Sequence, residues 1–227
     1  MIPRPENPLI VALDLSDLAE ADAMASALAP TVGMVKMGFE LFSAHGPAAV
    51  ERLADRAPVF LDLKLHDIPT TVERAARNCA RLGIAMLTVH ALGGEAMVSS
   101  AVRGAAQGSS EIGRPPPRIA AVTVLSSLSG ESLASPTSLA FEARAAGASA
   151  IVVSGEDVRE VREVLGEEIA LVVPGIRPAG SNGHDQMRVL TPSEAIEAGA
   201  DYLVIGRPIT GAADPSGAAR AILASVR

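Results

Sequence analysis

The chain has 227 residues, of which 48% are apolar and 20% are charged, a composition that supports a large buried core and excludes a disordered protein. Its 19 basic and 26 acidic side chains give a net charge of −7, and only five Phe and Tyr residues and no Trp are present. Nonspecific nucleic-acid binding is therefore not expected, because it needs a basic surface and aromatic side chains that stack on bases.

No pattern at the start of the sequence suggests a signal peptide, since "MIPRPENP" leads directly into an apolar run. No apolar run approaches the roughly 18 uncharged residues that a membrane span requires. We therefore expect a cytoplasmic enzyme that binds neither membranes nor nucleic acid.

Short runs rich in β-branched residues alternate along the chain with alanine-rich stretches. The runs predict strands over residues 8–16, 32–39, 58–65, 85–91, 118–125, 148–154, 170–176 and 201–207. The stretches between them predict helices over residues 17–29, 46–56, 69–82, 94–106, 137–146, 156–165, 191–198 and 215–226. Residues 107–118, "QGSSEIGRPPPR", are rich in turn-forming residues and are expected to form a surface loop.

Strict alternation of strands and helices indicates a parallel sheet. Eight such units in one chain of this length fit a single-domain (β/α)₈ barrel, which usually takes roughly 200–250 residues. A doubly wound open sheet is the alternative, but the G-x-G-x-x-G pattern that often follows its first strand is missing. We predict one barrel domain over residues 1–227.

Polar residues alternate with leucines in "FLDLKLHDIPTT", residues 60–71. Side chains alternate faces along a strand, so Asp62 and Lys64 share one face. In a barrel the other face meets the helices, which points both charges into the barrel near the carboxyl end of the strand, where barrel enzymes place their chemistry. A satisfied ion pair with no further role is the alternative.

Two earlier strands carry charges at corresponding places. Asp14 ends the first strand and Lys36 lies near the end of the second, so these residues are expected to join Asp62 and Lys64 at the barrel mouth. Taken alone, Asp14 could cap the following helix and Lys36 could extend to the surface. Asp67 follows two residues before Pro69, where a helix N-cap is the alternative to a functional role.

Three further residues with reactive side chains favour structural roles. His66 and His90 are interpreted as core histidines that bond to the backbone. Cys79, the single cysteine, lies in a predicted helix and is interpreted as a small buried apolar residue. The spacing of His, Cys and carboxylate residues does not predict a metal site.

A second polar region follows the last two predicted strands. The loops after strands seven and eight often bind phosphate in barrels, through backbone N–H groups and a cation. Here they carry Arg177, Gln186, Gly206 and Arg207. Residues 178–188 form a long polar loop, which we expect to act as a lid.

Together, "ALD", "VKMG", "DLKLHDIPTT", "PGIRP…DQ" and "VIGRP" resemble, in order from about residue 9 to the end of the chain, the orotidine 5′-phosphate decarboxylases. The resemblance implies a homodimeric (β/α)₈ barrel that converts orotidine 5′-phosphate to UMP and CO₂, the last step of UMP synthesis, without metal or cofactor. It implies a charged row of Lys36, Asp62, Lys64 and Asp67, in which the partner subunit supplies Asp67 and Lys64 donates the proton.

The resemblance also implies a set of substrate contacts. Asp14 and Lys36 would meet the ribose, Ser126 the pyrimidine, and Gln186, Gly206 and Arg207 the phosphate. Arg177 would contact the substrate at an unassigned group, and Thr71 would close the Asp67 element from the partner side. His184, in the expected lid, is outside the family pattern and is interpreted as loop variation.

The chemistry of the reaction accounts for these residue types. Loss of CO₂ from C6 of the pyrimidine leaves a carbanion with little resonance stabilisation, which an adjacent ammonium group can stabilise and then protonate. Carboxylates beside Lys64 would keep its ammonium charged in a buried site.

Two alternatives to this activity remain. Keto-gulonate-phosphate decarboxylases and hexulose-phosphate synthases are similar at Asp62, Lys64 and Asp67, but they use Mg²⁺ and carry a carboxylate where this chain has Lys36. A non-catalytic nucleotide-binding barrel would be expected to lack Lys64 or Asp62, and both are present.

Overall fold

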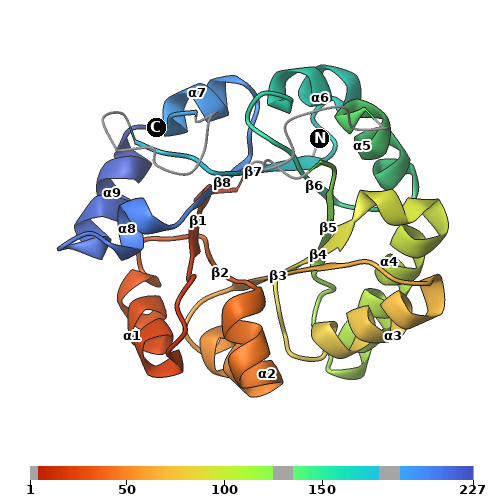
Figure 1. Cartoon of the computed structure of the whole chain (residues 1–227), viewed down its shortest axis with the longest axis horizontal. Helices are drawn as coiled ribbons and strands as arrows, with labels where there is room; N and C mark the ends of the chain where they lie inside the picture. Colours follow the sequence, from red (N-terminus) through yellow and green to blue (C-terminus); the bar gives the residue numbers. More distant parts are fainter. Residues whose placement is uncertain (1–4, 125–134, 179–189, 227) are drawn as a thin grey trace.

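The structure is a computed structural model that describes residues 5–124, 135–178 and 190–226. Its strands are all parallel and close into a barrel in chain order, with the last strand pairing with the first. Figure 1 shows the helices as a ring around this barrel. The strands are β1 (Leu9–Ala12), β2 (Met34–Met37), β3 (Val59–Leu65), β4 (Met86–His90), β5 (Arg118–Val122), β6 (Ala150–Val152), β7 (Ala170–Pro174) and β8 (Tyr202–Ile205).

The helices follow the strands as the sequence predicts. They are α1 (Leu18–Leu28), α2 (Phe39–Ala54), α3 (Pro69–Ala80), α4 (Gly94–Glu111), α5 (Pro136–Ala145), α6 (Val158–Leu165), α7 (Pro192–Glu197), α8 (Arg207–Thr210) and α9 (Pro215–Ala224), with a short 3₁₀ helix, η1 (Ala91–Gly93), after β4. The predicted single-domain (β/α)₈ barrel is confirmed, and each predicted strand overlaps an observed one. No helix among the described residues is both long and apolar enough to cross a membrane.

Helix α4 corrects one expectation, because residues 107–111, assigned to a loop, belong to this helix. A Cβ added at Gly104 would lie 2.0 Å from the backbone oxygen of Glu73, and one at Gly108 would lie 2.2 Å from that of Arg77. These glycines therefore let α4 pack directly against the backbone of α3. The glycine at position 108 is therefore explained by the close packing of two helices and does not mark a loop.

Two other helices also differ from the prediction. Helix α2 starts at Phe39 instead of residue 46, because a first segment precedes a kink at Gly46, whose φ is 65°, and Pro47. Helix α8 was not predicted, since its four residues are too few to show a helical period.

Even-numbered strand residues fill the inside of the barrel. At its centre they include Ile10, Met34, Phe60, Met86, Ala120, Ala150, Val172 and Tyr202. Odd-numbered residues such as Val11, Val35 and Leu61 pack against the helices. This alternation places Lys36, Asp62 and Lys64 on the inner face, above the apolar centre.

Candidate active site

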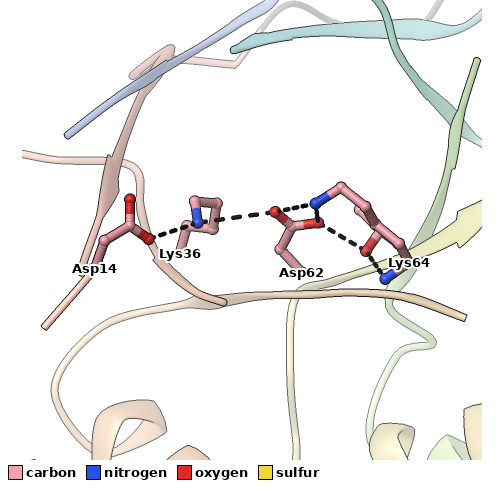
Figure 2. A network of polar contacts seen from close by, with 5 residues as sticks. Asp14, Lys36, Asp62 and Lys64 are labelled. Atoms are coloured by element: carbon pink, nitrogen blue, oxygen red, sulfur yellow. Dashed lines mark hydrogen bonds and ion pairs between the residues drawn. The ribbon is translucent and has the colours of Figure 1, made fainter. Parts of the chain in front are cut away.

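Four charged residues form a continuous row across the mouth of the barrel (Figure 2). The ammonium of Lys36 lies 3.0 Å from Oδ1 of Asp14 and 3.7 Å from Oδ2 of Asp62. The ammonium of Lys64 lies 2.8 Å from Oδ1 and 2.9 Å from Oδ2 of Asp62. The order along the row is Asp14, Lys36, Asp62, Lys64, so each inner charge has an opposite charge on either side.

Burial differs along this row. The Lys36 and Asp62 side chains are only 12% and 15% exposed, whereas Asp14 is 62% exposed. Lys36 therefore does not extend to the surface, contrary to one alternative. Asp14 does not cap α1 either, because Asp17 does so by accepting a hydrogen bond from the Glu20 N–H at 2.8 Å. The structure thus brings together the four charges that the strand pattern predicts.

A cavity of about 260 Å³ opens beside the row. Lys36, Asp62 and Lys64 form its charged side. Its other walls are largely apolar and consist of Phe60, Val122, Val124, Val152, Val153, Ser154, Pro174 and Val204. Charges that face such a wall act through a medium of low dielectric constant, which strengthens their effect on a bound molecule.

Strand β3 is irregular where it carries the row. Its pairing with β4 passes from Leu61 opposite Leu87 to Leu65 opposite Val89, so four steps on β3 match two on β4. Lys64 lies in this bulge and has a φ of 47°, the only positive φ of a non-glycine residue in the described part of the chain. Such backbone strain often accompanies functional sites.

Thr88 of β4 is a site residue that the sequence reasoning missed. It is fully buried, its hydroxyl accepts a hydrogen bond from the Lys64 N–H at 2.7 Å, and it donates one to Oδ1 of Asp62 at 2.9 Å. One signal could have identified it: Thr88 is a polar residue on the inward face of a strand that is otherwise apolar there until His90.

Asp67 lies beyond the end of β3 and is exposed. One of its carboxylate oxygens accepts a hydrogen bond from the Ile68 N–H at 2.6 Å, and the N-cap position of α3 is Ile68 rather than Asp67. The N-cap alternative for Asp67 is therefore wrong. The ion pairs recorded for Lys36 and Lys64 within the described chain involve Asp14 and Asp62, and not Asp67. Thr71, in the first turn of α3, is also exposed.

The two histidines differ from each other. His66 is exposed, so its assignment to the core is wrong; β3 ends at Leu65 and the chain leaves the barrel there. His90 is half-buried, and its Nδ1 accepts a hydrogen bond from the Leu92 N–H at 3.4 Å, as expected of a histidine that bonds to the backbone. The rings stack with centroids 5.3 Å apart. Burial, with the nearby His66 and Lys64, lowers the pKa of His90.

The residues of the predicted phosphate-binding region that the structure describes follow the last two strands. Gly206 directly follows β8, and an added Cβ there would lie 3.5 Å from the Cβ of Ala12 and 3.8 Å from Oδ2 of Asp14. Arg207 is exposed at the start of α8, and Arg177 follows β7, its N–H donating to the Leu190 carbonyl at 3.1 Å. Ser126, Gln186, His184 and residues 179–188 of the expected lid lie outside the described residues.

Cys79 is buried in α3, which confirms its interpretation as an apolar residue. Burial raises the pKa of its thiol to about 11. Within residues 5–124, 135–178 and 190–226, no group of three or more His, Cys, Asp or Glu side chains is arranged to hold a metal ion.

A closed (β/α)₈ barrel with lysine and aspartate side chains around a cavity at the carboxyl ends of its strands has the features of a barrel enzyme that acts on a small molecule. The family model described as "Orotidine 5'-phosphate decarboxylase / HUMPS family" matches residues 7–222. The chain belongs to this family.

Similar proteins and solved structures also support this family assignment. An orotidine 5′-phosphate decarboxylase of Moorella thermoacetica is 48% identical, over 97% of this chain and 92% of the relative. One from Anaeromyxobacter sp. (strain K) is 50% identical, over 98% of this chain and all of the relative. The crystal structure of the Lactobacillus acidophilus enzyme of that name superposes with a TM-score of 0.86 at 38% identity, covering 98% of this chain and 100% of that one.

Proposed function

We propose that the protein decarboxylates orotidine 5′-phosphate to UMP and CO₂, the last step of UMP synthesis, and does so in the cytoplasm. One observation supports this proposal most strongly: in this chain, which belongs to the family, the row of Asp14, Lys36, Asp62 and Lys64 borders a cavity with largely apolar walls. The family relatives at 48% and 50% identity bear the name of this activity and match nearly the whole chain.

In the proposed reaction, the bond between C6 and the carboxylate carbon breaks and leaves its electron pair on C6. The Lys64 ammonium stabilises this charge, donates a proton to C6 to form UMP, and regains a proton from solvent. Asp62 holds the ammonium through both carboxylate oxygens. Its second neighbour, Lys36, balances the negative charge of Asp62 at 3.7 Å.

The remaining substrate contacts are proposed from the resemblance to the orotidine 5′-phosphate decarboxylases. Asp14 and Lys36 would bind the ribose, and Gly206, Arg207 and Gln186 the phosphate. The closeness of Gly206 to Asp14 supports this division, because a nucleotide joins its ribose and phosphate through one short link. The pyrimidine base would contact Ser126, and an unassigned group of the substrate would contact Arg177. The partner subunit would contribute Thr71.

We also propose that the reaction needs no metal or cofactor, unlike that of the Mg²⁺-dependent enzymes of similar sequence. The Lys36 ammonium lies between Asp14 and Asp62 and neutralises these two carboxylates, which would otherwise be the ligands for a metal ion. A divalent cation in this position would face an adjacent positive charge.

The test of activity is the loss of orotidine 5′-phosphate absorbance with the purified full chain, measured with EDTA and with added Mg²⁺. We expect equal turnover under both conditions. Turnover of orotidine 5′-phosphate only with Mg²⁺ would overturn the metal-independent mechanism. Turnover of a sugar phosphate but not of the nucleotide would assign the chain to the other activity.

A homodimer with shared active sites is the final part of the proposal. Asp67 is exposed next to Ile68, which is 67% exposed. The stacking of His66 on His90 brings this segment near the one that carries Leu92, which is 54% exposed. A second copy that covers this apolar surface would bring its Asp67 to the Lys64 ammonium. Each site would then combine Lys64 of one chain with Asp67 of the other.

Subunit mixing tests this arrangement. Lys64→Ala and Asp67→Ala homodimers should each be nearly inactive, yet after exchange their heterodimers contain one intact site, which restores about a quarter of all sites under random pairing. Mixing Lys64→Ala with Asp62→Asn is the matched control, because both defects lie in the same half of the site and no heterodimer gains an intact one. If tagged heterodimers form without regained activity in the first mixture, Asp67 acts within its own chain.

A further inference from the structure

Thr88 replaces a missing backbone partner at the bulge of β3. The bulge places two extra residues of β3 between the pairs Leu61–Leu87 and Leu65–Val89. The Lys64 N–H therefore leaves the regular ladder with β4 and donates instead to the Thr88 hydroxyl at 2.7 Å. A buried N–H needs such a partner, so Thr88 favours the backbone conformation of Lys64 with a φ of 47°.

The same hydroxyl also orients a charged side chain. It donates its one proton to Oδ1 of Asp62 at 2.9 Å, and this oxygen lies 2.8 Å from the Lys64 ammonium. The two hydrogen bonds need one group that accepts and donates at once, which a hydroxyl does and a methyl group does not. Thr88 thus connects the backbone of Lys64 to the carboxylate that holds the Lys64 side chain.

We propose that Thr88 is a positioning residue for the decarboxylation: it holds Lys64 in its left-handed conformation and turns Asp62 so that the Lys64 ammonium faces the cavity. Thr88 is fully buried and is not among the residues that line the cavity, so it acts through Lys64 and Asp62 and not by touching the substrate. This inference rests on the proposed function for its kinetic consequences, but its structural consequence stands independently.

Two pairs of proteins isolate the hydroxyl. Wild type and Thr88→Val differ by one hydroxyl in place of a methyl group, and Thr88→Ser and Thr88→Ala differ by a single oxygen. We expect Thr88→Val and Thr88→Ala to lower kcat on the order of 10–100-fold, because displacing a reacting group by about 1 Å has an effect of this size. KM should change by less than about threefold, since the proposed ribose and phosphate contacts come from other strands. Thr88→Ser should retain a kcat close to that of wild type.

Thr123→Val is the matched control. Thr123 is also fully buried, and its hydroxyl donates to the backbone carbonyl of Val152 at 3.2 Å, with no bond to Asp62 or Lys64. Loss of this hydroxyl should lower the melting temperature without changing kcat. A fall in kcat for Thr123→Val equal to that of Thr88→Val would show that the effect comes from general loosening of the barrel and would overturn the positioning role.

Crystal structures supply a measurement that does not depend on activity. In Thr88→Val or Thr88→Ala, the φ of Lys64 should leave the positive range or the Asp62 carboxylate should rotate away from its present position, whereas Thr88→Ser should preserve both. If both variants that lack the hydroxyl keep the wild-type arrangement, or keep the wild-type kcat, the inference is wrong. An inactive wild type would overturn the proposed function, and the crystal structures would still decide the role of Thr88.

Discussion

The row of charges at the barrel mouth contrasts with a second cluster, the helix cluster, which Asp22 of α1 forms with Arg52 and Arg56 at the end of α2 and just after it. In the helix cluster, Asp22 accepts hydrogen bonds from Nε of Arg56 at 2.8 Å and from a terminal nitrogen of Arg52 at 2.9 Å. These contacts, chiefly those from Arg56 and then Arg52, hold the pKa of Asp22 well below its usual range. The mouth row has similarly short ion pairs, yet its surroundings are different.

The difference lies in the cations and in what they face. A guanidinium forms a rigid, forked pair with a carboxylate and does not release a proton near neutral pH, which suits a structural contact. An ammonium is a compact charge with protons that it can transfer, and Lys36 and Lys64 direct theirs toward a cavity. Lys64 also has a strained backbone with a positive φ, whereas Asp22 lies within α1, Arg52 within α2, and Arg56 in the turn just after α2. Ion pairs of equal length can therefore serve stability in one place and chemistry in another.

The largest expected effect is on catalytic activity, and it should arise from a substitution in the row at the barrel mouth and not in the helix cluster. Lys64→Ala should lower kcat by more than about 10³-fold, because it removes both the charge that stabilises the carbanion and the proton donor. The melting temperature should change little, since Lys64 is partly exposed at the barrel mouth. Steady-state kinetics and thermal unfolding measure the two quantities. A folded variant within tenfold of wild-type activity would contradict the role proposed for Lys64.

Asp22→Asn should have the opposite result, with lower stability and unchanged activity. The substitution leaves two guanidinium groups beside a neutral amide and should lower the melting temperature by a few degrees. Because the folded protein lowers the pKa of Asp22, its contribution to stability is present above the ordinary carboxyl pKa of about 4 and decreases as the pH falls below it. The difference in melting temperature between wild type and Asp22→Asn should therefore narrow in acid. An unchanged difference from pH 7 to pH 3 would contradict this account.

The smallest effect concerns His90, next to the mouth row. The folded protein lowers its pKa, chiefly through burial, so protonation favours the unfolded chain. Stability should fall as the pH decreases below the ordinary histidine pKa of about 6.5. His90→Asn should reduce the loss of melting temperature between pH 7.5 and pH 5.5, and His66→Asn, at the exposed partner ring, is the control with a smaller change. Equal slopes for wild type and His90→Asn would contradict the prediction.

Much of the site could be predicted because a strand has a period of two residues. Asp62 and Lys64 alternate with leucines, so the parallel sheet that the strand–helix alternation implies leaves them the inner face. The same reasoning placed Asp14 and Lys36 at the mouth. Where two local roles competed, as for Asp14 and Asp67, the residue pattern could not decide, because a carboxylate just before a helix is compatible with capping and with binding.

The sequence by itself determined the architecture and the inward charges, since both follow from local periodicity and the order of the elements along the chain. Only the tertiary structure decided the features that depend on contacts between distant residues. Glycines at 104 and 108 belong to a helix because α3 packs closely against them. Lys64 takes a left-handed conformation because β3 bulges against β4, and Thr88, 24 residues away along the chain, supplies the hydrogen bond that the bulge removes from the ladder. Such a contact leaves no periodic pattern in the sequence, because it depends on the register between two strands and not on the order of residues within either one.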